Sequence, residues 1–258
     1  MRLLLLLIVI GVPCFAQTPL TRAHAHNDYE HTHPLADALA QGFGSIEADV
    51  YPIDGELLVA HDVGNVKPDR TLEKLYLAPI KERFDQNKGQ VIPGLRTLIL
   101  LIDIKTNGLL AYQTLEKQIE KYKSMLTEFA DGKVKTNAVT IILSGDRPRE
   151  YLTAQKQRWA ALDGRLVDLS QNPSTALIPL VSDAWSAHFK WKTGPRPAEE
   201  ATHLKEIISQ AHQQGRLLRF WAVPDRVEAW AMLYDAGVDL INTDHLEELS
   251  AFLRSRVR

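Results

Sequence analysis

The first part of the chain carries three polar clusters, each directly after a short apolar run. The clusters are His24-Ala25-His26-Asn27-Asp28, Glu47-Ala48-Asp49 and His61-Asp62. Burying two carboxylates such as Glu47 and Asp49 side by side costs free energy unless a positive charge compensates them. We therefore expect a cation beside this pair, and a metal ion is the simplest candidate.

The spacing of these residues indicates which side chains face the same way. Side chains two positions apart on a strand lie on the same face. The pairs with this spacing are His24 and His26, Glu47 and Asp49, and Asp103 and Lys105. Three carboxylates that converge at one edge favour one hard divalent cation, Mg²⁺ or Ca²⁺, with water completing its coordination. The alternative is that the carboxylates form salt bridges with basic residues, namely Arg22, Lys105 or Arg147.

Two of the histidines in these clusters have no evident ligand role. His26 and His61 are each followed by a polar residue at the end of a predicted strand. Beside a hard cation, such histidines suggest general acid–base catalysis. Six other histidines, all outside these clusters, are interpreted as structural or exposed residues: His31, His33, His188, His203, His212 and His245.

The elements that must position these groups alternate between strands and helices along the chain. Strands are predicted at 22–26, 45–51, 56–60, 98–105, 138–143, 166–169, 178–181, 217–223 and 238–242. Helices are predicted at 34–41, 71–77, 109–129, 150–159, 197–214, 225–236 and 245–254. Such alternation is typical of an α/β fold with a parallel sheet covered by helices. The number of strands, and the lack of a glycine-rich phosphate loop, favour a single (β/α)₈ TIM-type barrel with its site at the carboxyl ends of the strands.

Residues 1–16 have the pattern of a secretory signal peptide. Arg2 precedes the apolar run 3–12, and Ala16 ends a suitable cleavage site. The run is short for a membrane span, and a retained anchor is the alternative interpretation. We expect cleavage to release residues 17–258 as one barrel domain, secreted or periplasmic. The single cysteine, Cys14, leaves with the signal, so the released chain has no disulfide.

Composition restricts the partners of this domain. The net charge is −2 and 45% of the residues are apolar, as in an ordinary globular domain. No basic run indicates nucleic-acid binding or a membrane-surface patch. We expect a monomer without a stable membrane span.

The ordered motifs His26, Glu47-x-Asp49, His61-Asp62 and Asp103-x-Lys105 resemble those of the phosphatidylinositol-phospholipase-C-like phosphodiesterases. That superfamily includes glycerophosphodiester phosphodiesterases and sphingomyelinase D. The start His26-Asn27-Asp28 is most similar to the branch named for altered inheritance of mitochondria protein 6. The resemblance resumes at 101–106 and 237–244, and it implies a barrel fold and phosphodiester hydrolysis.

The same resemblance implies roles for individual residues. His26 and His61 match a catalytic pair, and Lys105 matches a lysine that contacts phosphoryl oxygens. The metal ligands it implies are Glu47, Asp49 and Asp103, and Trp221 is similar to a pocket-lining tryptophan. Two positions differ from the glycerophosphodiesterases, because Asn27 replaces a phosphate-binding arginine and Asp103 replaces a glutamate. Asn27 is a candidate for binding the substrate in part of that arginine's role. The Asp-x-Lys-Thr sequence is closer to the sphingomyelinase D pattern.

Three other stretches follow predicted strands or join them. Arg147, in Ser144-Gly145-Asp146-Arg147, is a candidate for binding the substrate phosphate, or part of a turn. The aromatic and basic stretch 185–192 is interpreted as a loop that packs on the barrel rim, with lipid contact as the alternative. Asp244 is interpreted as the N-cap of the last helix.

Together these observations predict a secreted, metal-dependent phosphoric diester hydrolase. Its substrate would be a glycerophosphodiester or a phospholipid-type molecule. The part that the site binds would be a small phosphodiester or a lipid head group. One alternative is a zinc-dependent amidohydrolase-like enzyme that uses His24 and His26, although the middle predicted strands end without histidine. The other is a catalytically inactive barrel that binds a phosphorylated ligand, although both histidines and all three carboxylates are intact.

Overall fold

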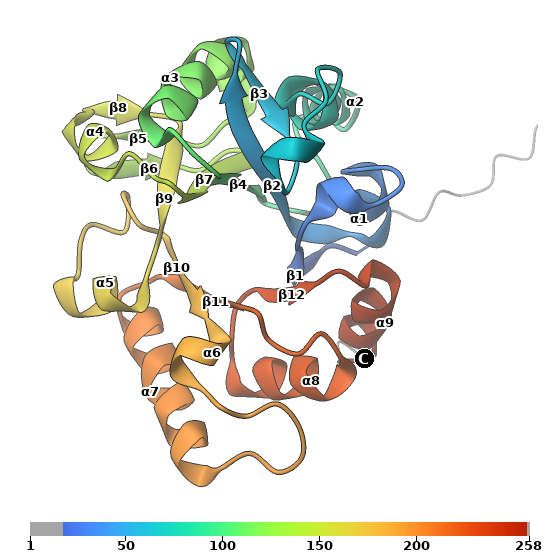
Figure 1. The fold of residues 1–258 in the computed structure, drawn as a ribbon, viewed down its shortest axis with the longest axis vertical. Helices are drawn as coiled ribbons and strands as arrows, with labels where there is room; N and C mark the ends of the chain where they lie inside the picture. The colour runs from blue at the N-terminus through green and yellow to red at the C-terminus, as the bar shows by residue number, and fades with distance from the viewer. Residues whose placement is uncertain (1–17, 257–258) are drawn as a thin grey trace, which may run out of the picture.

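The computed structural model describes residues 18–256, and the predicted signal peptide, residues 1–16, lies outside this range (Figure 1). Its central feature is a ring of parallel strands. In ring order the strands are β11 (Leu217–Trp221), β10 (Leu180–Ala184), β9 (Ala160–Gly164), β7 (Val139–Gly145), β4 (Leu98–Ile104), β2 (Phe43–Ile53), β1 (Leu20–Ala25) and β12 (Ile241–Thr243). A parallel bridge between Arg219 and Leu240 joins the two ends of this order. The ring is thus a nearly closed eight-stranded barrel, and the predicted fold is confirmed.

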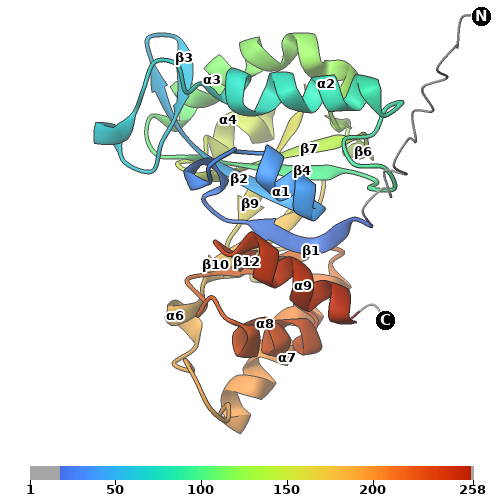
Figure 2. The same cartoon turned by 90° about the vertical axis from the view of Figure 1, so that its right-hand side faces the viewer.

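Helices surround the barrel on the outside (Figure 1). They are α1 (Ala36–Gln41), α2 (Ala78–Gln86), α3 (Gly108–Ile119), α4 (Arg149–Ala154), α5 (Leu166–Gln171), α6 (Trp185–His188), α7 (Ala198–Gln213), α8 (Val227–Ala236) and α9 (Leu246–Arg256). Helices α8 and α9 lie together on one side of the barrel, and α2 and α3 lie on the opposite side (Figure 2). Within the described range, no helix combines the length and the apolar character needed to cross a membrane.

The strands bury both faces, as strands of parallel barrels do. In β4, Leu100 and Ile102 face the helices and belong to the large outer core. The alternate residues Ile99 and Leu101 face inward and form a small apolar layer with Ile142 of β7, Leu180 of β10 and Leu240, which directly precedes β12. Asp103 continues the inward-facing series at the carboxyl end of β4, so the apolar layer forms the floor beneath the polar mouth.

One predicted strand was wrong, and one strand was missed, around the middle of the chain. The predicted strand 166–169 is helix α5, and the strand that enters the barrel is β9, six residues earlier in the sequence. A short apolar run does not distinguish a strand from a helix by periodicity. Here the Asp168 carboxylate accepts a hydrogen bond from the Arg165 backbone N–H, at 2.8 Å, in a capping box that starts the helix.

The predicted helices 109–129 and 150–159 are shorter than expected. Helix α3 is followed by a 3₁₀ turn, Glu120–Met125, and then by strand β5 (Glu128–Ala130). This strand pairs with β6 (Lys133–Lys135) and with β8 (Gln157–Arg158) in a small antiparallel sheet. Asp131 and Gly132 both have positive φ angles, 50° and 73°, which suits a tight hairpin turn and ends the helical pattern.

Short elements complete the mouth of the barrel. Strand β3 (Glu56–Val59) returns antiparallel to β2 after a turn at Asp54-Gly55. The 3₁₀ segments Asp28–Glu30 and Val63–Asn65 and the π-helical turn Glu73–Leu77 lie between the regular elements. The stretch 185–192 packs through buried Trp185, Phe189 and Trp191, in agreement with its interpretation as a packed loop.

Asp28 anchors the loop between β1 and α1. Its Oδ2 accepts hydrogen bonds from the Leu35 N–H at 2.6 Å and the Tyr76 hydroxyl at 2.8 Å, and the residue is buried. Burial raises the pKa of the Asp28 carboxyl to about 6, although both hydrogen bonds oppose the shift. Because the folded state holds the proton more tightly than the unfolded state, this group stabilises the fold less as the pH rises towards 6.

The variant Asp28→Asn removes this titration. We expect its free energy of unfolding, relative to the unmodified protein, to improve by about 2 kcal/mol between pH 4.5 and pH 7.5. Urea unfolding at the two pH values measures the difference. A constant difference between the two proteins would show that the Asp28 pKa is unshifted.

Candidate active site

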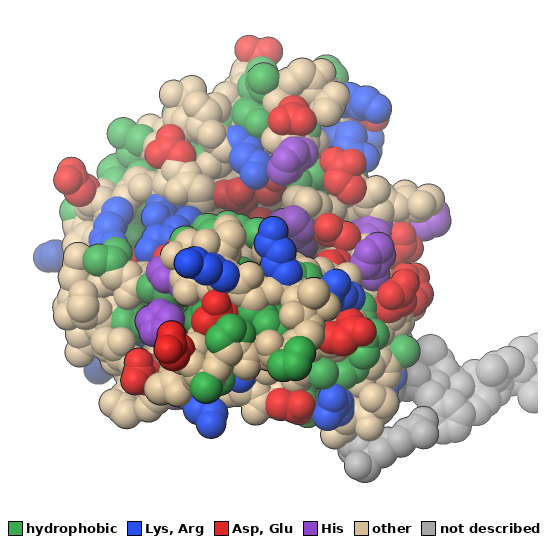
Figure 3. All heavy atoms as spheres, turned by 60° about the horizontal axis from the view of Figure 1, so that its bottom comes forward, with side chains coloured by type: hydrophobic (Ala, Val, Ile, Leu, Met, Phe, Trp, Pro, Cys, Tyr) green, Lys and Arg blue, Asp and Glu red, His purple; other side chains and the backbone are tan. Residues whose placement is uncertain are grey.

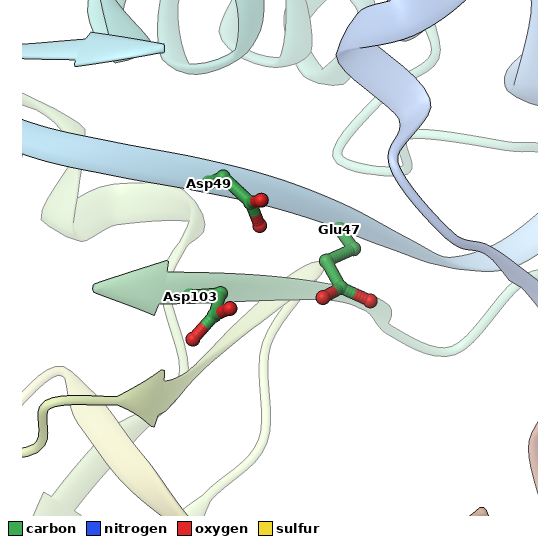
Figure 4. Close-up of side chains that lie close together, drawn as sticks. All are labelled: Glu47, Asp49 and Asp103. Atoms are coloured by element: carbon green, nitrogen blue, oxygen red, sulfur yellow. The ribbon is translucent and has the colours of Figure 1, made fainter. Parts of the chain in front are cut away.

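Three carboxylates meet at the carboxyl ends of two neighbouring barrel strands. Glu47 and Asp49 lie on β2, and Asp103 lies on β4, where it is the direct register partner of Asp49. One oxygen of each residue lies within 4.8 Å of one oxygen of each of the others. Figure 4 shows the three side chains pointing to the same side of the strands. The predicted same-face spacing therefore brings the predicted metal ligands together.

The cluster has the properties of a site for a hard cation. Within the described chain, Oδ1 of buried Asp49 has no hydrogen-bond partner. Burial and the charge of Glu47 raise the pKa of Asp49, although hydrogen bonds from Lys105 and Tyr29 oppose this shift. Three carboxylates without a soft ligand are suited to Mg²⁺ or Ca²⁺ rather than to a thiolate-seeking metal. The donor set thus fits one divalent cation.

Lys105 lies against the same carboxylates. Its Nζ is 2.7 Å from Asp49 Oδ2 and 2.7 Å from Asp103 Oδ2. Burial would lower the pKa of Lys105, but its bonds to Asp103 and Asp49 outweigh burial and raise it. The lysine is therefore a permanent positive charge at the edge of the cluster.

Two buried residues, Arg219 on β11 and His24 on β1, contact the Glu47 carboxylate. Its Oε2 accepts a hydrogen bond from Arg219 Nη1 at 2.9 Å and lies 2.9 Å from His24 Nε2. Burial opposes ionisation of Glu47, but the charge of Arg219 and the contact with His24 outweigh it and lower the pKa. Glu47 is thus kept ionised inside the barrel, and Arg219 is a site residue that the sequence reasoning missed.

His24 is a packed partner rather than a free ligand. Its Nδ1 is 2.7 Å from the Ser45 hydroxyl, and its Nε2 is 2.5 Å from Arg219 Nη1. Burial and the charge of Arg219 lower the pKa of His24 to about 4, so the imidazole is neutral. Both ring nitrogens are occupied by protein groups, which does not favour the interpretation of His24 as a zinc ligand.

His26 lies at the mouth and is oriented by Asp244. Its Nδ1 is 2.8 Å from Asp244 Oδ1, and its backbone N–H donates to the Thr243 carbonyl at 3.1 Å. Burial lowers the pKa of His26, but the hydrogen bond to Asp244 and the charges of Glu47 and Asp244 outweigh burial and raise it. Asp244 was predicted to cap the last helix; its carboxylate instead contacts His26, which leaves Nε2 of that ring for chemistry.

Replacing Asp244 with asparagine tests this contact. The variant loses the charge that raises the His26 pKa, so we expect that pKa to fall. If His26 acts as the base, the acidic limb of the pH–rate profile moves to lower pH, and kcat falls because the ring is less well oriented. NMR titration of the His26 ring checks the pKa, and an unchanged titration midpoint would contradict the assigned contact.

His61 lies on the other side of the carboxylates. Its Nδ1 is 3.2 Å from Asp49 Oδ2 and 3.2 Å from the Tyr29 hydroxyl, and 56% of its side chain is exposed. The Tyr29 hydroxyl also lies 2.5 Å from Asp49 Oδ2 and 2.8 Å from Asn27 Oδ1. Asn27 in turn contacts His26 Nδ1 at 3.1 Å. Tyr29 therefore links the two histidines to a metal-ligand candidate, although the sequence reasoning gave it no role.

These groups surround one cavity of about 320 Å³. It is lined by His26, Asn27, Glu47, His61, Asp103, Lys105, Ser144, Gly145, Arg165, Arg219 and Trp221. Figure 3 shows one face of the molecule on which acidic side chains lie recessed between basic and histidine side chains. Asp49 is fully buried behind the lining, and Asp103 is partly accessible.

Arg147 takes a different position from the other predicted site residues. Its Nη1 donates to the backbone carbonyl of Asp163, and its side chain lines a separate hollow with Leu109, Pro148 and Arg149. Arg165 occupies the main cavity instead. It was missed because it directly follows β9, the strand that the sequence reasoning did not identify.

Comparison with known proteins identifies the family of this chain. Residues 16–162 match the AIM6-like phosphodiesterase domain, and residues 218–247 match the glycerophosphoryl diester phosphodiesterase family. Altered inheritance of mitochondria protein 6 from Eremothecium gossypii is 30% identical over 90% of this chain and 69% of its own length. The protein of the same name from Lachancea thermotolerans is 28% identical over 89% of this chain and 65% of its own length. The chain thus spans about two thirds of these relatives.

A solved structure has the same fold. A glycerophosphodiester phosphodiesterase from Parabacteroides distasonis superposes with a TM-score of 0.58 and 16% identity, covering 93% of this chain and 100% of that chain.

Proposed function

Because the chain belongs to the AIM6-like phosphodiesterase domain family, we propose that it hydrolyses phosphoric diesters with one bound divalent cation, Mg²⁺ or Ca²⁺. The substrate class is a glycerophosphodiester or a phospholipid-type head group. The observation that carries the proposal is the convergence of a three-carboxylate cluster, Lys105 and two histidines around one cavity.

Charge neutralisation is the first task of this site. Glu47, Asp49 and Asp103 would hold the cation, which when bound supplies positive charge for the phosphoryl oxygens. Lys105 supports the same task from the protein side, because its ammonium lies at the cavity surface beside Asp103. Fixed positive groups stabilise the charge that develops on a phosphoryl group in the transition state.

Proton transfer is the second task. His26 presents Nε2 to the cavity, since Asp244 occupies Nδ1, and it takes a proton from the attacking hydroxyl or water. His61 likewise has Nδ1 beside Asp49 and Tyr29, and its Nε2 gives a proton to the leaving alcohol oxygen. Each transfer needs a heavy-atom distance of about 2.6–3.2 Å to the substrate oxygen.

Phosphorus-31 NMR of a glycerophosphodiester incubated with the protein and Mg²⁺ or Ca²⁺ tests the reaction class. The proposal predicts that the diester resonance is replaced by a phosphomonoester resonance, or first by a five-membered cyclic phosphate. It also predicts no change in the presence of chelator. Conversion that continues unchanged in chelator would contradict a metal-dependent diesterase.

A further inference from the structure

A second cavity, of about 400 Å³, lies beside the active-site cavity. It is formed by the segment after β1, the end of β3 and the loop 62–70 that follows β3. Its polar lining residues are Tyr29, Glu30, His31, Asn65, Lys67 and Arg70, and none of them lines the active-site cavity. Tyr29 lies between the two cavities, because its hydroxyl contacts His61 of the active site at 3.2 Å. The second cavity is therefore a separate feature that the proposed reaction does not use.

Two cations of this cavity have no carboxylate partner. Within residues 18–256, neither Lys67 nor Arg70 forms an ion pair, whereas Lys105 and Arg219 of the active site do. Arg70 donates one side-chain hydrogen bond, from Nη2 to the Tyr29 backbone carbonyl, and its Nε and Nη1 bond to no group of the described chain. Both side chains thus keep N–H donors and a positive charge for a ligand.

The backbone determines where these two cations lie. Residues 67–70 form a turn that is closed by a hydrogen bond from the Arg70 N–H to the Lys67 carbonyl, at 3.0 Å, and Pro68 suits its second position. The Arg70 carbonyl accepts a hydrogen bond from the Val59 N–H at 2.8 Å, which joins the turn to β3. The first and fourth Cα atoms of such a turn are within about 7 Å of each other. One ligand can therefore contact both cations.

The other polar groups leave the cavity with a positive charge. Glu30 is its one lining carboxylate, and Asp62 and Asp69 of the neighbouring loop do not line it. Nε2 of His31 has no hydrogen-bond partner among residues 18–256. Even without a charge on His31, the described lining has two cations and one carboxylate.

A phosphomonoester is the anion that fits these groups best. It carries a charge of about −1.5 to −2 at pH 7 and three acceptor oxygens. A guanidinium binds such oxygens through two parallel hydrogen bonds, and an ammonium adds a point charge. A singly charged carboxylate would leave one of the two cations uncompensated. The volume lies in the range of about 300–1,000 Å³ that is usual for small-molecule sites, so the phosphate can carry a small alcohol.

We propose that this cavity is a second ligand site, which binds a phosphomonoester group through Lys67 and Arg70. The proposal is independent of the proposed function, since these two residues have no part in the hydrolysis. A soluble compound such as glycerol 3-phosphate and a lipid such as phosphatidic acid carry the same group, and the experiment distinguishes the two sources.

Amide NMR titration with glycerol 3-phosphate in the presence of Mg²⁺ tests the site, with glycerol as the uncharged probe. We expect the resonances of Gly64, Asn65 and Val66 to shift with glycerol 3-phosphate and not with glycerol. The Gly145 amide reports binding in the active-site cavity, which it lines.

Three variants of the lining residues test the charges. Arg70→Gln should weaken the Kd at least about tenfold, because hydrogen bonds to a charged group are worth that much. Lys67 is exposed, so Lys67→Gln should fold normally and weaken binding at least about threefold. Glu30→Gln removes a like charge and should tighten binding about twofold or more.

Arg96→Gln is the matched control. Arg96 is also an exposed cation without an ion pair in the described chain, but it precedes β4 and does not line the cavity. Its Kd should equal that of the unmodified protein. Shifts confined to Gly145 and its neighbours, or equal Kd values in Arg70→Gln, Lys67→Gln and Arg96→Gln, would overturn the site.

Flotation with phosphatidylcholine vesicles, with and without phosphatidic acid, distinguishes the sources of the group. Retention that requires phosphatidic acid and is lost in Lys67→Gln would support the site with a lipid ligand. Binding of glycerol 3-phosphate without retention on vesicles would support it with a soluble ligand. Neither shifts at Gly64, Asn65 and Val66 nor retention on vesicles would contradict the proposal.

Discussion

Replacement of His61 with alanine is expected to lower kcat by about 10²–10⁴-fold, the usual contribution of a general acid or base. The ring lies at the cavity with Nδ1 beside Asp49 and Tyr29, so its Nε2 is the atom available to a leaving oxygen. More than half of the side chain is exposed, and we therefore expect the variant to fold normally. Steady-state kinetics with a glycerophosphodiester and circular dichroism measure the two properties.

His33→Ala is the control for this substitution. His33 is also a largely exposed histidine in a loop beside a carboxylate, since its ring contacts Asp37 at 3.2 Å. It does not line the cavity, and its replacement should leave kcat within about twofold, as for an ordinary surface substitution. A His61→Ala enzyme as active as His33→Ala would remove His61 from the mechanism.

Replacement of Arg219 with methionine is expected to destabilise the fold by about 3–5 kcal/mol, because it leaves a buried carboxylate without its partner. The guanidinium and the Glu47 carboxylate are 2.9 Å apart, and their side chains are only 4% and 6% exposed. Methionine conserves much of the volume, so the main change is the loss of charge and of hydrogen bonds. Urea unfolding monitored by fluorescence measures the effect.

A double variant separates charge compensation from packing. In Arg219→Met with Glu47→Gln, no unpaired charge remains, and most of the lost stability should return. The pH dependence of the free energy of unfolding provides a second test of the Glu47–Arg219 pairing. Glu47 has a lowered pKa when folded, so its pairing stabilises the native state above its unfolded pKa and is lost in acid. Equal losses in the single and double variants would show that the Arg219 contribution is steric.

The barrel and its principal clusters could be predicted because they depend on local spacing. Glu47 and Asp49 face the same way wherever they lie on a strand, and the same holds for Asp103 and Lys105. Parallel pairing then brings their strand ends to one edge, which is why Asp49 and Asp103 are register partners. The family motif adds His26 and His61, whose catalytic roles stay predictions.

The contacts that support these groups depend on closure of the ring and have no local pattern. Arg219 reaches His24 across 195 positions of the sequence, and Asp244 reaches His26 across 218. The spacing of residues in one amino-acid sequence does not indicate contacts between positions so far apart. For Asp244, the position before a predicted helix favoured a cap, whereas closure of β12 against β1 brings the carboxylate to His26.

The failure to identify β9 as a strand explains why Arg165 was not recognised as a cavity residue. The sequence Ala160-Ala161-Leu162-Asp163-Gly164 is weakly apolar and rich in alanine, and alanine is depleted in strands. Its neighbours in the barrel, β7 and β10, make it a strand. Assigning the strand to 166–169 moved the expected strand end away from Arg165, and the cation that stacks on Trp221 was therefore not recognised.

The most direct test of the metal-dependent site is the hydrolysis rate of bis-p-nitrophenyl phosphate by the purified protein with Mg²⁺, with Ca²⁺ and with chelator. The same assay is run on Asp49→Ala, which removes the buried carboxylate at the centre of the cluster, and on His26→Ala. We predict turnover only when a divalent cation is present, and at least about a 100-fold loss in each variant. Turnover that persists in chelator and survives both substitutions would contradict the assignment of this cavity as a metal-dependent phosphodiesterase site.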